Sequence, residues 1–360
     1  AIYSVAKRQC KRIFPALPNL RQVPRISKRQ DNLMTEHCRI VADIGGTNAR
    51  FAIADEGAPG FSRELTLRCD DFDSAGAAIR AYIAETGLPD PDVICLATAG
   101  PVVDQTVRFT NNHWTIDASE LQREFGTERV RLMNDFEAIA YSIPFLTPAD
   151  CLPVGLPDPR PIADTDFTVA VVGPGTGLGA VGLIRRGQEL YPVVGEAGHV
   201  GFSPETRVQL DILTALRERY DRVSVERLVS GPGLENIYSA LTRIHGEQRT
   251  QLKAAEIFEA AAGSDDPRAA ETLQLFFETL GQFAGNLALT LGAQDGIFIG
   301  GGIVRRYPQL LENSGFRSGF ESKGRHRSLM EQIPTQLITH PEPGLLGASY
   351  CAQRLLRNPA

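Results

Sequence analysis

Three glycine-rich turns, each following an apolar run, constrain the fold of this chain more than any other feature. They occupy residues 43–48, 173–179 and 300–302. Glycine permits positive φ and close approach of the backbone, so successive N–H groups can converge on phosphate oxygens without a side chain between them. The three turns together predict a nucleotide-binding site.

The first two turns lie between two strands. An apolar run at 39–42 leads into the first turn and an alternating run at 49–54 leaves it, while 167–172 and 180–184 flank the second. This pattern predicts β-hairpins whose tips face phosphate. A dinucleotide fingerprint requires a strand-to-helix turn with a third glycine, and Leu178 stands there instead. The Walker pattern is also absent. Each turn taken alone is equally compatible with an ordinary tight turn.

Length and composition indicate a folded protein with two domains. The chain has 360 residues, of which 42% are hydrophobic, and a net charge of −6. That charge gives no general reason to expect nucleic-acid binding, and no stretch approaches the roughly 20 apolar residues of a membrane helix. The six cysteines show neither C-x-x-C spacing nor nearby paired histidines, which argues against zinc or a disulfide framework. We expect reduced thiols, a cytoplasmic location, and neither a nucleic-acid nor a membrane partner.

The first 33 residues differ from the rest. They hold eight Lys or Arg residues against Asp31 alone, together with three prolines, which leaves a net charge of about −13 for the remainder. A transit peptide is one interpretation, although the prolines interrupt an amphipathic helix. Met34 and Thr35, immediately before the first strand, favour upstream read-through or added sequence. We predict that residues 1–36 are a disordered or non-native extension outside the fold.

The remaining pattern is typical of an α/β fold. Helices are predicted at 72–85, 119–125 and 269–291, and the last carries an apolar face at steps of three and four residues. A proline-rich stretch at 144–161 predicts the domain boundary and places the two hairpins in different halves. Strands are predicted at 39–42, 49–54, 93–97, 130–133, 167–172 and 296–299.

Asp135 is the candidate catalytic base. It follows the apolar run at 130–133 and precedes a helical stretch, so its carboxylate lies where a strand opens onto a helix. In phosphoryl transfer a carboxylate accepts the proton of the attacking hydroxyl. The alternative is that Asn134 and Asp135 cap the helix.

A second polar cluster consists of Glu196 and His199 among small residues, with Glu226 further along before a glycine-rich helix start. Carboxylates and imidazole among glycines can bind several vicinal hydroxyls, as a sugar requires. A turn histidine and a surface glutamate are the alternatives. A metal site is another, but no H-E-x-x-H motif accompanies these residues.

These motifs together resemble bacterial glucokinase, the ATP-dependent hexose kinase group of the actin, Hsp70 and sugar kinase superfamily. The resemblance spans residues 38 to about 355. The segments that carry it are 43–50, 110–114, 134–136, 173–179, 195–200, 226–233, 300–304 and 343–347.

The resemblance implies a two-domain actin-like (ribonuclease H-like) ATPase fold with a cleft between the domains. The small α/β domain would comprise 37–145 plus 336–360, to which the final helix returns, and the large one 146–335. The domains would close on sugar, and the protein would be a homodimer.

The resemblance also implies roles for individual residues. Asp135 would act as the base at the 6-hydroxyl of glucose, and Asp43 would orient Mg²⁺ through water. Gly301 and Gly302 would lie against adenosine. Glucose would be contacted by Asn134, Asp135, Glu196, His199 and Glu226. The other nucleotide-binding residues would be Ala42, Asp43, Ile44, Gly45, Gly46, Thr47, Asn48, Gly175, Thr176 and Gly177.

The sequence departs from the related repressor and kinase family, which has a zinc-binding cysteine cluster after its Glu-x-Gly-His. Residues 200–227 here contain no cysteine, so zinc is not expected. The leading hypothesis is therefore a kinase that converts ATP and D-glucose to ADP and glucose 6-phosphate. The alternatives are a sugar-responsive regulator, which needs a DNA-binding motif before Asp43, and an actin- or Hsp70-like ATPase module. Selectivity among glucose, mannose, fructose and glucosamine, the phosphoryl donor, and allosteric regulation stay open.

Overall fold

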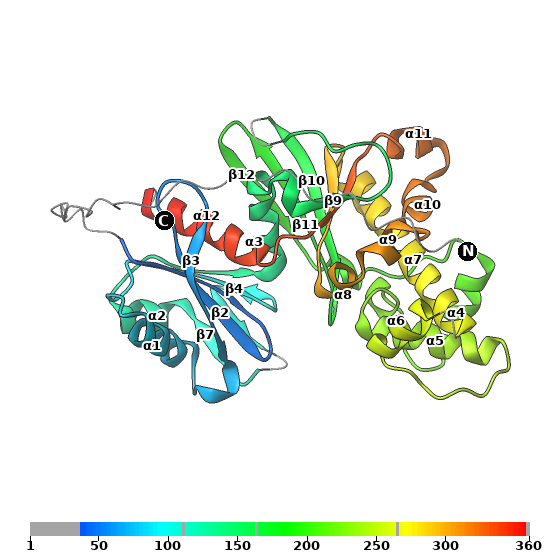
Figure 1. Ribbon diagram of the computed structural model, residues 1–360, viewed down its shortest axis with the longest axis horizontal. Coiled ribbons are helices and arrows are strands. Elements are labelled where there is room, and N and C mark those ends of the chain that lie inside the picture. Colours follow the sequence, from blue (N-terminus) through cyan, green and yellow to red (C-terminus); the bar gives the residue numbers. More distant parts are fainter. Residues whose placement is uncertain (1–36, 110–111, 163–164, 264–265, 358–360) are drawn as a thin grey trace, which may run out of the picture. The chain divides into compact units, whose positions relative to one another are not determined.

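The computed structural model describes residues 37–357 except 110–111, 163–164 and 264–265. The predicted extension at 1–36 and two residues of the 110–114 motif therefore lie outside the described residues. All described residues belong to one compact unit. Figure 1 shows their helices and strands along the chain.

A five-stranded sheet lies in the first part of the chain, in the order β3-β2-β1-β4-β8. Strands β1, β4 and β8 run parallel, whereas β2 is antiparallel to both of its neighbours. The parallel strands bring their carboxyl ends to one edge. The bounds are β1 (Arg39–Ile44), β2 (Asn48–Ala54), β3 (Phe61–Arg68), β4 (Val93–Thr98) and β8 (Val130–Asn134).

The second sheet repeats this arrangement. Its six strands have the order β12-β11-β10-β13-β14-β9, and the first five repeat the directions of the first sheet. The bounds are β9 (Cys151–Pro153), β10 (Phe167–Pro174), β11 (Leu178–Arg186), β12 (Glu189–Val194), β13 (Gly296–Ile299) and β14 (Thr335–Ile338). A small sheet holds β5 (Val102–Val103), β6 (Thr106–Arg108) and β7 (Thr115–Asp117).

The predicted helices are present with small shifts. Helix α1 (Ala75–Thr86) begins three residues later than predicted because the Ser74 hydroxyl caps it, accepting a hydrogen bond from Ala77 N at 3.1 Å. The other helices are α2 (Ala118–Phe125), α3 (Asp135–Ser142), α4 (Arg207–Arg217), α5 (Gly231–Ile244), α6 (Ala254–Ala262), α7 (Pro267–Leu291), α8 (Gly302–Arg306), α9 (Pro308–Glu312), α10 (Phe316–Glu321), α11 (Arg327–Met330) and α12 (Pro343–Arg357).

Alternate residues of the first sheet face two apolar layers. Ile40 and Ile44 pack in the cluster that contains residues of α1 and α2, whereas Val41 packs with residues of α3 and α12. Figure 1 shows the C-terminal helix α12 in red, and its contacts are with β1, β4 and α3. The Val41 cluster also includes Val171 of β10, so one core joins the faces of both sheets.

The predicted domain boundaries stay a prediction. Strand β9, just after the predicted boundary at 145, belongs to the six-stranded sheet, as does β14 at Thr335–Ile338. The chain therefore returns to the first sheet only at α12, which packs on β1 and β4.

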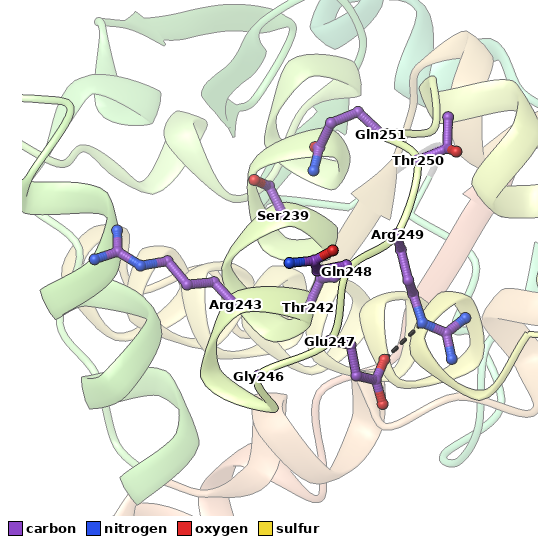
Figure 2. A pocket seen from close by; sticks show the side chains of 9 residues that line it. All are labelled: Ser239, Thr242, Arg243, Gly246, Glu247, Gln248, Arg249, Thr250 and Gln251. Atoms are coloured by element: carbon purple, nitrogen blue, oxygen red, sulfur yellow. Dashed lines mark hydrogen bonds and ion pairs between the residues drawn. The ribbon is translucent and has the colours of Figure 1, made fainter.

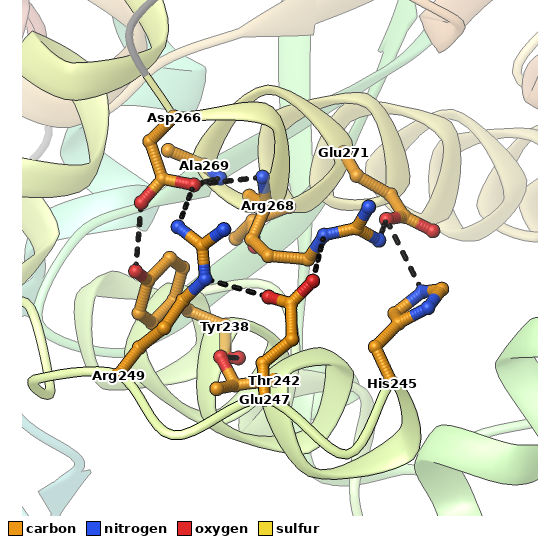
Figure 3. A network of polar contacts seen from close by, with 10 residues as sticks. Tyr238, Thr242, His245, Glu247, Arg249, Asp266, Arg268, Ala269 and Glu271 are labelled. Atoms are coloured by element: carbon orange, nitrogen blue, oxygen red, sulfur yellow. Dashed lines mark hydrogen bonds and ion pairs between the residues drawn. The ribbon is translucent and has the colours of Figure 1, made fainter.

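A polar network holds the connection between α5 and α6 against α7 (Figure 3). Arg249 pairs with Glu247 at 2.6 Å and with Asp266 at 2.8 Å, and the Tyr238 hydroxyl donates to Asp266 at 2.8 Å. Arg268 pairs with Glu271. No residue of the network is a predicted site residue, and we assign it a structural role.

None of the described helices is long and apolar enough to cross a membrane. The described cysteines are free and buried. They are Cys38, Cys69, Cys95, Cys151 and Cys351.

Candidate active site

The first predicted hairpin is confirmed between β1 and β2. Gly45 N donates to Asn48 O at 2.9 Å, and Thr47 O accepts from Cys69 N at 2.9 Å. The Asn112 side chain braces the tip by donating to Gly45 O at 3.3 Å. Thr47 is exposed and Gly46 is half-buried. The tip is thus a fixed loop with accessible backbone.

Not every residue of this hairpin can reach a ligand through its side chain. Ala42 and Ile44 are fully buried in the core, so they contribute only backbone groups. Asp43 lies between them and its side chain projects to the other face, where the start of α12 packs on it. A Cβ added at Gly344 would lie 3.2 Å from Asp43 Oδ2. The pKa of Asp43 is raised to about 7, chiefly by burial, and further by the charges of Asp135 and Glu342.

Asp135 lies at the first residue of α3, directly after the carboxyl end of β8. The helix-cap interpretation of the preceding residue is confirmed, because Asn134 Oδ1 accepts from Phe136 N at 2.9 Å. Asp135 Oδ1 accepts from the same N–H at 2.9 Å. Its pKa is nevertheless raised to about 6 by burial, with the charge of Glu196 adding to the effect and backbone hydrogen bonds opposing it.

The second predicted hairpin, between β10 and β11, is confirmed too. Gly173 and Gly179 face each other across it. A Cβ at Gly179 would overlap the Phe136 ring, and one at Gly173 would lie 2.9 Å from that ring. Phe136 therefore fills the space left by a cross-strand glycine pair, and it directly follows the candidate base. Close packing, and not phosphate approach alone, explains these two glycines.

Glu226 connects the polar cluster to this hairpin. It lies in a 3₁₀ turn, η5 (Val225–Arg227), and its Oε2 accepts from Leu178 N at 2.9 Å. A Cβ at Gly177 would lie 2.5 Å from the same oxygen. Gly175, at the tip, has open space around its Cβ position. Thr176 is exposed at this tip, and Gly175 and Gly177 on either side of it are half-buried.

The structure brings Glu196, His199 and Glu226 together. Glu196 caps the 3₁₀ turn η4 (Ala197–His199), and the His199 ring lies 4.0 Å from each of the two carboxylates. Glu196 is 68% exposed, whereas Glu226 is 25% exposed. Exposed carboxylates around an imidazole can exchange water for sugar hydroxyls at low cost.

The third turn packs on the second. Gly300 N donates to Val172 O at 2.8 Å, and Gly301 has a φ of 92°, which favours glycine. A Cβ at Gly301 would also overlap Pro174 O. Gly302 begins α8 and is exposed. Two of the three predicted turns thus form one surface.

Carboxylates extend from the first hairpin to the polar cluster of Glu196, His199 and Glu226. The charge of Asp135 raises the pKa of Asp43, and that of Glu196 raises the pKa of Asp135. These residues come from β1, α3 and the start of η4. Two carboxylates that repel each other beside a hairpin with accessible backbone fit a Mg²⁺ ion carried by phosphates, because Mg²⁺ takes one or two carboxylates plus phosphate oxygens and water.

Sequence reasoning missed two contributors. Phe136 and Asn112 were part of recognised motifs but had no assigned role. The facing glycines at 173 and 179 are the signal that an aromatic ring covers the hairpin. The contact of Asn112 with Gly45 joins residues 67 positions apart, and local patterns carry no such information.

A separate hollow of about 670 Å³ lies beside the end of α5 (Figure 2). Its lining includes Ser239, Arg243 and Arg249, and the whole of residues 246–251. Arg243 pairs with Glu218, and Arg249 belongs to the network of Figure 3. It shares no residue with the candidate site.

The family model described as Glucokinase matches residues 40–355. The chain belongs to the glucokinase family. The glucokinase of Caulobacter sp. strain K31 is 41% identical over 313 residues, covering 86% of this chain and 93% of that protein. The crystal structure of a glucokinase from an Antarctic psychrotroph has a TM-score of 0.81 at 34% identity, covering 89% of this chain and all of that one.

The family resemblance and the actin-like α/β fold are thereby confirmed. A ROK family glucokinase from Streptomyces griseus, in complex with glucose and AMPPNP, has a TM-score of 0.60 at 21% identity, covering 88% of this chain and 99% of that one. At that identity the likeness concerns the fold alone. The roles of individual residues in this glucokinase-family chain stay predictions.

Proposed function

We propose that this protein transfers the γ-phosphoryl group of ATP to the 6-hydroxyl of D-glucose, giving glucose 6-phosphate and ADP. The observation that carries the proposal is the position of Asp135. Its carboxylate, with a pKa of about 6, lies in electrostatic reach of Asp43 at the first hairpin and of Glu196 in the polar cluster. A base between a phosphate-binding turn and a sugar-binding cluster is what a hexose kinase requires.

Asp135 accepts the proton of the 6-hydroxyl while the hydroxyl oxygen attacks the γ-phosphorus. The bond between that phosphorus and the bridging oxygen breaks, and ADP leaves with the electron pair. A base with a pKa of about 6 is ionised at neutral pH yet basic enough to take the proton as the bond forms. No phosphoenzyme is required.

Glucose is held by Glu196, His199 and Glu226, with Asn134 beside the base. The Asn134 amide donates one hydrogen bond to Gly100 O at 3.2 Å, and its second N–H is left for a sugar hydroxyl. Glu226 accepts from Leu178 N through one oxygen, so its other oxygen is left for the sugar. Sugar binding at Glu226 would thus also affect the second hairpin, through the hydrogen bond from Leu178 N.

The nucleotide contacts the two hairpins and the third turn. Backbone N–H groups of Gly46, Thr47 and Asn48, together with Thr176, bind the phosphates, whereas the N–H of Gly45 closes the hairpin onto Asn48 O and Gly45 only permits close approach of the backbone. The surface of Gly301 and Gly302 takes the adenosine. Asp43 would hold Mg²⁺ through water, and the ion would neutralise charge on the phosphates.

The test is a coupled assay for glucose 6-phosphate with the purified protein. ATP and Mg²⁺ are offered with glucose, mannose, fructose and glucosamine, and then ADP and polyphosphate replace ATP with glucose. Glucose-dependent ADP release matched by glucose 6-phosphate supports the proposal. ATP hydrolysis without a phosphorylated sugar would instead favour an ATPase module.

We also propose a cytoplasmic homodimer. The support for the dimer is strand β12, at the edge of its sheet, whose Tyr191, Val193 and Val194 side chains are exposed. Apolar side chains on an unpaired edge are typical of an interface. Sedimentation at two protein concentrations tests it, and a concentration-independent monomer would contradict it.

A further inference from the structure

The ring of Phe136 joins the candidate base to the second hairpin. Phe136 directly follows Asp135 in the first turn of α3, and its ring lies against the facing pair Gly173 and Gly179. A Cβ at Gly179 would overlap the ring, and one at Gly173 would lie 2.9 Å from Cζ of the ring. The hairpin tip at 175–177 begins two residues beyond this pair on each strand. The ring therefore contacts both strands of the hairpin just before its tip.

Helix α3 has little room to move. A Cβ at Gly347 of α12 would overlap Ala138 O, so the backbones of these two helices are in direct contact. Helix α12 in turn packs on β1 and β4 of the first sheet. Because protein interiors are close-packed, a smaller side chain at position 136 leaves a gap that the hairpin or the first turn of α3 partly fills. Either movement changes the distance between the base and the hairpin.

The backbone of Phe136 also orients the carboxylate of the base. Phe136 N donates to Asp135 Oδ1 and to Asn134 Oδ1, each at 2.9 Å. These bonds and the ring belong to one residue, so a displacement of the ring also shifts the carboxylate. In phosphoryl transfer a protein acts mainly by positioning the reacting groups, and a misplacement of about 1 Å can cost about 100-fold in rate.

We propose that Phe136 is a positioning residue for phosphoryl transfer, and that its ring sets the distance between the Asp135 carboxylate and the tip of the second hairpin. The tip carries Thr176, which binds a phosphate of ATP in the proposed function. Phe136 acts through Asp135 and contributes no reacting group. The effect on turnover rests on the proposed function, whereas the effect on the distance does not.

Steady-state kinetics of the full chain tests the effect on turnover. Phe136→Leu should lower kcat by about ten- to a hundredfold and leave the KM values for glucose and ATP within about threefold of the wild type. Gly179→Ala disturbs the same contact from the hairpin and should have the same effect. In the double variant the new methyl group fills part of the space that the ring vacates, so its kcat should exceed that of either single variant by at least about threefold.

Phe125→Leu is the matched control. Phe125 is a buried ring at the end of α2, in the apolar cluster that contains residues of α1, and it belongs to no predicted site. This variant should lose stability in urea unfolding but keep the kcat of the wild type. A kcat of Phe136→Leu within about twofold of the wild type, an equal loss of kcat in Phe125→Leu, or a double variant no more active than the single variants would overturn the proposal.

Crystals of the ligand-free wild type and of Phe136→Leu, grown in the same form, supply the second readout. The distance between Asp135 Cγ and Thr176 N should differ by at least about 0.5 Å, the tolerance of a catalytic arrangement, and should return towards the wild-type value in the double variant. An unchanged distance overturns the positioning role, whether or not the protein phosphorylates glucose. A changed distance in a protein that phosphorylates no glucose supports the positioning and overturns the proposed function alone.

Discussion

Asp135 and Asp43 are half-buried carboxylates whose pKa values are raised towards neutrality. For each of them burial is the largest cause, and neighbouring acidic groups add to it. Asp150, in contrast, caps a 3₁₀ turn, and hydrogen bonds from Thr147 lower its pKa. Raised pKa values in a group of converging acids are typical of catalytic sites.

Replacement of the base tests its role. We expect Asp135→Asn to bind glucose nearly as well as the wild type but to lose at least about 100-fold in turnover, the scale of general-base contributions. Steady-state kinetics and calorimetry measure the two effects. Asp117→Asn is the matched control, because the Asp117 carboxylate, like that of Asp135, accepts a backbone N–H at the start of a helix that follows a strand, and this variant should keep full activity. Near-normal turnover of Asp135→Asn would remove the residue from the mechanism.

The pH dependence of the reaction follows from the same group. Protonated Asp135 cannot accept the proton of the hydroxyl, so kcat/KM should fall about tenfold per pH unit below its pKa of about 6. Profiles between about pH 4.5 and 8.5 measure this limb. The limb should vanish in Asp135→Asn. A wild-type profile that stays flat down to about pH 5 would contradict the assignment.

The raised pKa of Asp43 predicts that the stability of the protein falls as the pH rises, whereas its activity should fall as the pH is lowered. Its pKa is raised from 3.8 to about 7 in the folded protein, so the folded state binds the proton more tightly. Protonation of Asp43 therefore stabilises the folded state. This stabilisation is complete below about pH 4 and is lost as the pH rises through 7. Asp43→Asn should therefore exceed the wild type in free energy of unfolding at pH 8, on the order of a few kcal/mol, and match it near pH 4. Urea unfolding measures the difference in free energy of unfolding between the variant and the wild type. A difference that does not change with pH would refute the explanation.

At the scale of secondary-structure elements, the sequence indicated both hairpins and the central strands except β14, which lies inside the six-stranded sheet but was not predicted. Runs such as 40–42 and 169–172 are buried in the sheets and hence uniformly apolar. Strands β3 and β12 gave no comparable signal, because edge strands with mostly exposed side chains lack that pattern. The position of Phe136 against the second hairpin depends on how α3 packs, which no local pattern encodes.

Within the second hairpin, Gly179 is required for packing, whereas Gly175 lies at the tip where a ligand would bind. Gly179→Ala should destabilise the protein, because the new methyl group overlaps the Phe136 ring, and Phe136→Leu should recover part of the loss. Gly175→Ala has open space around its Cβ and should keep the stability of the wild type. Thermal unfolding of the two single variants and the double variant measures this. Equal stability of Gly175→Ala and Gly179→Ala would contradict the packing explanation.

At the scale of the whole molecule, two sheets with the same strand order share one core. Helix α3 begins at Asp135 and contacts β4 and β8 of one sheet and β10 and β11 of the other. The candidate base is therefore fixed by both sheets, while the polar cluster and the second hairpin are joined through Glu226. The repeated strand order was not apparent from the sequence, because strands of equal position share little local pattern.

A crystal structure of the protein with glucose and a non-hydrolysable ATP analogue is the decisive test of Asp135 as the base. We expect an Asp135 carboxylate oxygen within hydrogen-bonding distance of the glucose O6, with O6 facing the γ-phosphorus. A carboxyl group directed away from a bound hexose, or a hexose bound without Glu196, His199 and Glu226, would contradict it.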